Sequence, residues 1–244
     1  MADFRRFAIY HLPDQAALSS FGARWLGWDI DTGSVPSAWC GAAMETGGNG
    51  SEITVPDADR AAVAHLTETP RKYGFHATVK PPFRLAEGVS ADALASAARD
   101  LASQTRPVTL HGLTIARLGH FLALVPDGPS GALEDMAFNW VKALDRFRAP
   151  PSDSELDRRR AAGLSARQEA LLQDWGYPFV GPEFRFHMTL TGRLADAATE
   201  RAARGLIATC LPEIPRPYIV ASLALVGERP DGRFETIEQL PLTG

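Results

Sequence analysis

Residues 75–80 read Phe-His-Ala-Thr-Val-Lys, and residues 186–191 read Phe-His-Met-Thr-Leu-Thr. Both stretches are short, contain aromatic and β-branched residues, and alternate between apolar and polar side chains, which predicts two β-strands. In each strand a histidine is followed two positions later by a threonine on the same face. The histidines, His76 and His187, lie 111 residues apart (187 − 76), close to half of the 244-residue chain. This spacing indicates two similar halves that each contribute one strand to a shared site.

Strand alternation places a row of polar side chains opposite the apolar face of each strand. The candidate site residues in these rows are His76, Thr78, Lys80, Arg185, His187 and Thr189. A single histidine on a strand is more often a hydrogen-bonded structural residue than a catalytic one. The repetition of histidine, threonine and the preceding phenylalanine favours a polar cleft that both strands line.

The rest of the chain predicts helices and strands in an order that repeats. Residues 4–11 alternate as a first strand, on which Tyr10 either faces the cleft or is partly buried. Pro81-Pro82 is expected to end the first motif strand. After each motif strand we expect a helix and then two strands. We expect one domain, with a first motif lobe around 52–126, a helical insertion around 130–176 and a second motif lobe around 180–240.

Composition favours a globular protein and limits the classes of partner. Hydrophobic residues make up 45% of the chain, while a net charge of −4 and a pI near 5.9 argue against nonspecific binding to duplex nucleic acid. Cys40 and Cys210 have no metal-type spacing, and the glycine-rich residues 47–50 lack the Lys-Ser/Thr of a phosphate-binding loop. We find no signal peptide or membrane span and expect a cytoplasmic protein.

Two longer strings carry a family resemblance: Tyr-Gly-Phe-His-Ala-Thr-Val-Lys-Pro-Pro-Phe (73–83) and Phe-Arg-Phe-His-Met-Thr-Leu-Thr-Gly-Arg-Leu (184–194). They resemble the 2H phosphoesterase superfamily, which is LigT-like, and within it the branch labelled as phosphonate-metabolism proteins. The resemblance covers almost the whole chain. It implies a bilobed α+β fold in which antiparallel sheets are duplicated about a pseudo-two-fold axis and helices pack outside. It also implies a central cleft carrying the two His-x-Thr strands.

The resemblance assigns His76 and His187 as catalytic residues and Thr78 and Thr189 as phosphate-binding residues, with no metal or other cofactor. Two imidazoles that titrate near neutrality can serve as the base and the acid on opposite sides of a phosphorus atom. The threonine hydroxyls can donate to phosphoryl oxygens, and cations on the same faces can offset their charge. The sequence does not decide which histidine is the acid.

These features predict a metal-independent cyclic phosphodiesterase, and they leave its substrate open. A small cyclic phosphate, a nucleotide or a ribose phosphate ester is favoured over an RNA end because the chain is acidic. The phosphonate label suggests a cyclic ribose phosphate. We expect a monomer without a membrane partner. The alternative is a module that binds a nucleotide or phosphorylated sugar in the same cleft without turnover.

Overall fold

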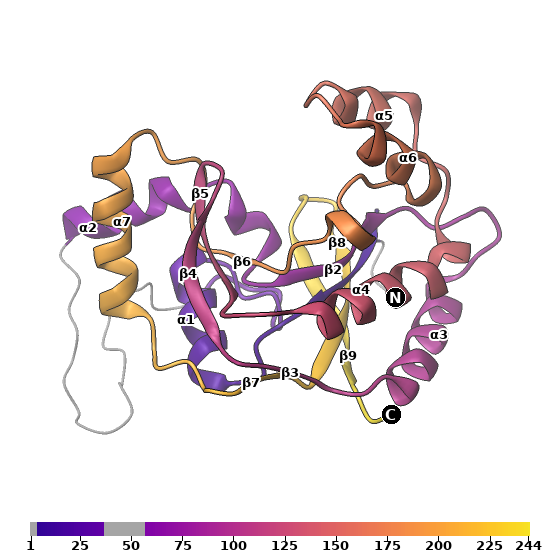
Figure 1. The fold of residues 1–244 in the computed structure, drawn as a ribbon, viewed down its shortest axis with the longest axis horizontal. Helices are drawn as coiled ribbons and strands as arrows, with labels where there is room; N and C mark the ends of the chain where they lie inside the picture. Colours follow the sequence, from indigo (N-terminus) through magenta and orange to yellow (C-terminus); the bar gives the residue numbers. More distant parts are fainter. Residues whose placement is uncertain (1–3, 37–56) are drawn as a thin grey trace.

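The structure is a computed structural model that describes residues 4–36 and 57–244. Its helices and strands follow one another along the chain as shown in Figure 1. In order they are β1 (Phe7–His11), α1 (Ala16–Leu26), α2 (Asp57–Leu66), η1 (Pro70–Tyr73), β2 (Ala77–Phe83), α3 (Ala91–Gln104), β3 (Val108–Leu110), β4 (Leu113–Leu118), β5 (Phe121–Pro126), α4 (Gly131–Ala143), η2 (Asp145–Phe147), α5 (Asp153–Arg160), α6 (Ala166–Trp175), η3 (Gly181–Glu183), β6 (Met188–Thr189), α7 (Ala197–Cys210), β7 (Tyr218–Val220), β8 (Ser222–Glu228) and β9 (Phe234–Pro241).

The strands form two antiparallel sheets. A seven-stranded sheet has the order β4-β5-β6-β2-β1-β8-β9, and β3 pairs with β7 in a separate two-stranded sheet. The fold is therefore α+β with antiparallel sheets, as the sequence predicts. β2 and β6, which carry the two motifs, are hydrogen-bonded neighbours in the large sheet. The two motif strands are therefore adjacent in one continuous sheet, whereas the resemblance implies two strands that carry the motifs in a central cleft.

The order of strands is nearly symmetric about the β2–β6 pair. Strands β1 to β4 correspond in sequence to β5 to β8, and the final strands β4 and β8 lie beside β5 and β1, respectively. The helix and two strands expected after each motif are α3, β3 and β4 in the first half and α7, β7 and β8 in the second. This symmetry places α4, α5 and α6 within the second half, where they correspond to α1 and α2.

Helix α1 holds the two motifs in place from the core side of the sheet. Gly22 lies so close to Phe75 that a Cβ on it would overlap the phenylalanine ring, so only glycine permits this approach. The indole Nε1 of Trp25 donates a hydrogen bond of 2.7 Å to the carbonyl of Leu190, which follows β6. One helix therefore positions the residue before His76 and the chain just beyond the second motif.

The first motif strand is longer than the sequence predicts, because β2 continues through Pro81 and Pro82 to Phe83. Its pairing with β1 contains two register shifts, which lie between Phe7 and Tyr10. Proline is tolerated in a strand at such bulges because the ladder is locally interrupted there. The prolines accompany bulges and do not end the strand.

The remaining expectations concern the two cysteines, the glycine-rich residues and membrane-spanning helices. Cys40 and the glycine-rich residues 47–50 lie outside the described residues, while Cys210 is buried at the end of α7. Across residues 4–36 and 57–244, no helix is both long enough and apolar enough to cross a membrane.

Candidate active site

The pairing of β2 with β6 brings the two motifs together on one face of the sheet. Ala77 is paired with Met188 in an antiparallel register. Continuing this register by one residue each way sets His76 opposite Thr189 and His187 opposite Thr78. Side chains directly opposite each other have Cβ atoms about 5 Å apart, and diagonal neighbours are about 7–8 Å apart. The two histidines are therefore diagonal neighbours, at a separation suited to a phosphate group between them.

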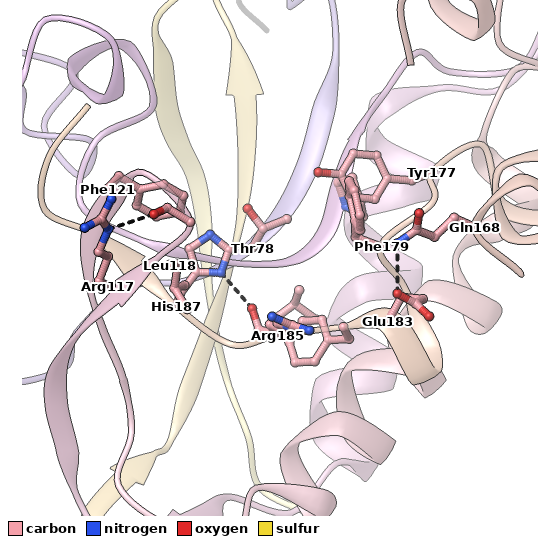
Figure 2. A pocket seen from close by; sticks show the side chains of 14 residues that line it. Thr78, Arg117, Leu118, Phe121, Gln168, Tyr177, Phe179, Glu183, Arg185 and His187 are labelled. Atoms are coloured by element: carbon pink, nitrogen blue, oxygen red, sulfur yellow. Dashed lines mark hydrogen bonds between the residues drawn. The ribbon is translucent and has the colours of Figure 1, made fainter. Parts of the chain in front are cut away.

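A cavity of about 650 Å³ opens over this part of the sheet. Figure 2 shows Arg117 and Phe121 on one side of it, Tyr177 and Phe179 on the other, and His187 between them. The residues that line it are Thr78, Val79, Pro81, Arg117, Leu118, Gly119, Phe121, Gln168, Tyr177, Phe179, Glu183, Phe184, Arg185 and His187. Of the four motif residues, Thr78 and His187 line the cavity directly.

His76 is held by hydrogen bonds at both ring nitrogens. Its Nδ1 lies 3.0 Å from the Gly74 carbonyl oxygen, and its Nε2 lies 3.1 Å from the Thr78 hydroxyl. Because a carbonyl only accepts, Nδ1 carries the proton and Nε2 of the neutral ring accepts from Thr78. Tyr10 stacks on the imidazole, with ring centroids 3.7 Å apart. Burial, and to a smaller degree repulsion from His187, lowers the pKa of His76 to about 4. His76 is therefore neutral at pH 7.

His187 shares with His76 the hydrogen bond at Nδ1. Its Nδ1 lies 2.7 Å from the carbonyl oxygen of Arg185, two residues earlier, just as His76 is bonded to Gly74. The same reasoning puts the proton on Nδ1 and leaves Nε2 of the neutral ring without a proton. The Phe121 ring lies 5.8 Å from the imidazole. Both histidines are thus oriented by a backbone carbonyl two residues upstream.

The cation predicted beside the second histidine also lines the cavity. The Arg185 side chain is exposed and has no hydrogen-bond or ion-pair partner in the part of the chain that the structure describes. It is free to bind an anion. Thr189 is half-buried in β6, beside Ala123 of β5.

The prediction that Lys80 faces the cleft is wrong. Its side chain is 2% exposed, and its ammonium donates to the Val141 carbonyl at 3.0 Å and to the Asp145 carboxylate at 3.4 Å. Burial lowers the pKa of Lys80 to about 8. The cause is the register shift between Tyr10, paired with Thr78, and Ile9, paired with Lys80. An extra residue in β2 breaks the alternation, so Lys80 turns towards α4.

Two further polar residues have supporting positions. Tyr10 does not line the cavity; it is buried against His76, and burial raises its pKa well above the usual value. Thr191, which alternation places on the polar face, is also buried. Its hydroxyl accepts from the Leu122 amide at 3.0 Å and donates to the Gly192 carbonyl at 2.9 Å. Thr191 therefore stabilises the backbone beyond β6.

Sequence reasoning missed most of the cavity wall. Arg117 and Phe121 come from the β4–β5 hairpin, and Tyr177 and Phe179 come from the segment between α6 and η3. No local pattern marks these residues, because they reach the motifs only through folding. No three His, Cys, Asp or Glu side chains within residues 4–36 and 57–244 are grouped closely enough to hold a metal ion.

A family model described as "Protein of unknown function (DUF1045)" matches residues 78–235. Two curated relatives are both named "Ribose 1,5-bisphosphate phosphokinase PhnN". The first, from Janthinobacterium sp. (strain Marseille), is 35% identical over 246 residues, which cover 98% of this chain and 51% of that protein. The second, from Laribacter hongkongensis (strain HLHK9), is 35% identical over 197 residues, which cover 78% of this chain and 41% of that protein. The chain spans about half the length of the curated relatives that it matches.

Two solved structures resemble the whole chain at low identity. One, described as "Crystal structure of phosphoesterase", has a TM-score of 0.38 and 16% identity, over 98% of this chain and 99% of the other. The second, "Crystal structure of E.coli LigT complexed with 3'-AMP", has a TM-score of 0.39 and 18% identity, over 99% of this chain and 100% of the other. With TM-scores below 0.5, these two structures carry no argument about activity.

Proposed function

We propose that this chain, which belongs to the family described as "Protein of unknown function (DUF1045)", is a phosphoesterase that splits a cyclic phosphodiester with two histidines. The observation that carries this proposal is the matched pair of imidazoles on adjacent strands. Each donates a hydrogen bond from its Nδ1 to the carbonyl two residues upstream, which directs Nε2 away from that carbonyl. A pair of oriented imidazoles across about 7–8 Å suits the transfer of one proton to and one proton from a phosphate group.

His76 is the better candidate for the base. Its ring carries the proton on Nδ1, which is bonded to the Gly74 carbonyl, so the unprotonated Nε2 is the atom that can take a proton from water. The oxygen of that water then forms a bond to phosphorus. His187, in its protonated form, donates its Nε2 proton to the ester oxygen as the bond from phosphorus to that oxygen breaks. The proton taken by one histidine and the proton given by the other balance the reaction.

Thr78, Thr189 and Arg185 would stabilise the phosphoryl oxygens. Thr78 lies 3.1 Å from the His76 Nε2, so its hydroxyl can turn from the imidazole to a bound phosphate. Arg185 supplies a guanidinium at the cavity surface that has no ion-pair partner among residues 4–36 and 57–244, and it can offset the charge that develops during the reaction. This electrostatic assistance, together with positioning, supports chemistry that needs no metal ion.

The proposed substrate is a small cyclic phosphate of a ribose or a nucleotide. A cavity of about 650 Å³ is within the usual range for sites that bind small molecules. The names of the curated relatives refer to a ribose bisphosphate, and this supports a ribose phosphate ester. The place proposed for the reaction, phosphonate catabolism, rests on the resemblance carried by the two motif strings. An RNA end is the less favoured substrate.

The proposal is tested by hydrolysis in the presence of EDTA. The panel contains adenosine 2′,3′-cyclic phosphate, ribose 1,2-cyclic phosphate and an aryl phosphodiester. The proteins compared are the wild type, the double variant His76→Ala/His187→Ala and the control His120→Ala, which changes an exposed histidine outside the cavity. We expect turnover that survives EDTA, is lost in the double variant and is retained in the control.

Two outcomes would overturn this proposal. Turnover that EDTA abolishes would indicate metal-dependent chemistry. Tight binding of one panel member, without turnover by any variant, would indicate a module that binds phosphorylated ligands without catalysis.

A further inference from the structure

Arg159, on α5, lies beside the wall of the cavity. Its guanidinium carbon is 4.4 Å from the centroid of the Tyr177 ring, and Tyr177 lines the cavity. The Arg159 Nε atom is buried and has no hydrogen-bond partner in the part of the chain that the structure describes. An unsatisfied buried donor is destabilising, and more so where the group is charged. An oxygen of a bound anion would satisfy it.

Arg159 differs from the other arginines of its helix. Arg158 is exposed, and Arg160 is exposed and paired with Glu169 at 2.7 Å. No residue of α5 is fully buried, and Arg159 is half-buried, as are Glu155 and Leu156. The pKa of Arg159 is lowered by burial first and then by the neighbouring Arg158 and Arg6 guanidiniums. A side chain that serves only solubility would stay in water.

A row of tyrosines joins Arg159 to the candidate active site. Tyr10, which stacks on His76, and Tyr73 both pack on the Phe234 ring, at 5.7 and 5.8 Å between centroids. The pKa of Tyr10 is raised by burial and then by neighbouring Tyr73, with a smaller effect of Tyr177. Figure 2 shows the Tyr177 hydroxyl directed towards the Thr78 side of the cavity. Tyr10 therefore contacts the histidine, Tyr177 contacts the arginine, and Tyr73 is close enough to both tyrosines to raise their pKa values.

The charges in this region leave an excess of positive charge. Arg6 is close enough to Tyr10 and Arg159 to affect their pKa values, but Glu228 neutralises it through hydrogen bonds of 2.5 and 2.8 Å. Glu155, the carboxylate that acts on Arg159, is bonded instead to Arg84 at 3.2 Å. Arg159 has no ion-pair partner in the described ranges. Its charge is available to a ligand.

We propose that Arg159 and the hydroxyl of Tyr177 form a second anion subsite, which binds a phosphomonoester at the end of the substrate remote from the reacting phosphate. This inference rests on the proposed function and names its substrate class: a ribose or nucleoside cyclic phosphate that carries a second phosphate. Phosphate oxygens accept the hydrogen bonds that arginine and phenol groups donate. Arg185 and the motif threonines hold the reacting group, and Arg159 holds the far end.

The binding test uses ribose 5-phosphate as the probe and ribose as the uncharged comparison, with affinities measured by titration calorimetry. We expect Arg159→Gln to weaken ribose 5-phosphate binding at least about tenfold, the size of a lost charge-assisted hydrogen bond. The matched control, Arg158→Gln, removes the same charge from the same helix at an exposed position and should change affinity by less than about twofold. Equal losses in both variants, or none in either, would overturn the subsite.

A conservative variant covers the case in which Arg159→Gln does not fold. Tyr177→Phe keeps the ring beneath the guanidinium and removes only the hydroxyl. We expect it to weaken ribose 5-phosphate binding severalfold, and unchanged affinity would contradict the proposal.

A turnover test separates this inference from the proposed function. It compares adenosine 2′,3′-cyclic phosphate with the same compound bearing a 5′-phosphate. We expect the wild type to prefer the 5′-phosphorylated compound in kcat/KM at least about tenfold, and Arg159→Gln to lose that preference. Hydrolysis of both compounds at equal rates by the wild type refutes the subsite and leaves the proposed function. Binding that depends on Arg159 without hydrolysis refutes the proposed function and leaves the subsite.

Discussion

Replacing His76 with glutamine should make the protein less sensitive to acid. In the folded chain the pKa of His76 is lowered from 6.5 to about 4, because the ring is buried and lies near His187. Below pH 6.5 the unfolded chain binds a proton at this ring that the folded chain does not. The free energy of unfolding therefore decreases as the pH falls from about 6.5 towards 4. The contribution of neutral His76 is fully present above pH 6.5.

The size of this effect follows from the difference in pKa. Each pH unit between the two pKa values costs about 1.4 kcal/mol, so from pH 7 to about pH 4.5 His76 alone should remove about 2–3 kcal/mol of stability. Glutamine does not titrate in this range, so His76→Gln lacks this loss. The substitution also changes the contacts with Gly74 and Thr78, and this change affects the stability of the variant equally at both pH values.

The assay is urea unfolding of the wild type and His76→Gln at pH 7 and at about pH 4.5, followed by circular dichroism. The quantity of interest is the change in unfolding free energy between the two pH values, compared between the proteins. Other groups, such as the buried His11, whose pKa is also lowered by burial, contribute equally to both and cancel. His120→Gln, at an exposed position, should behave as the wild type. A difference below about 0.5 kcal/mol between wild type and His76→Gln would refute the buried, neutral His76.

Three other changes test the positions of individual side chains. Gly22→Ala should destabilise the protein by about 1–3 kcal/mol in urea unfolding, because the new methyl group displaces the Phe75 ring; an unchanged midpoint would contradict this packing. Lys80→Met should keep kcat/KM for any substrate within about twofold, because the Lys80 ammonium faces α4. A tenfold loss would indicate that Lys80 acts in the active site. Arg185→Gln should lower kcat/KM about ten- to a hundredfold while the unfolding free energy stays within about 0.5 kcal/mol, since the side chain is exposed; loss of both would indicate a structural role.

Several features of this protein can be predicted from sequence because they depend on local periodicity. The alternation in residues 75–79 and 186–190 reports the apolar face of each motif strand, and Phe75 and Phe186 are buried as expected. The helical spacing of apolar residues predicts α1, α3 and α7. The repeat of the motif predicts the similar order of elements in the two halves. The periodicity signals involve residues within one turn or strand of each other, whereas the repeat is found by comparing two stretches of the chain.

The structure alone decided which of the predicted side chains meet. Lys80 obeys strand alternation in sequence, but the bulge that turns it towards Asp145 arises from the pairing of β2 with β1, about 70 residues away in the chain. Tyr177 lines the cavity, and Arg159 packs on its ring, only when the segments around α5 and α6 pack near β2. Periodicity records which face of an element is buried, whereas register and long-range packing determine the neighbours of each side chain, and these require the assembled sheet.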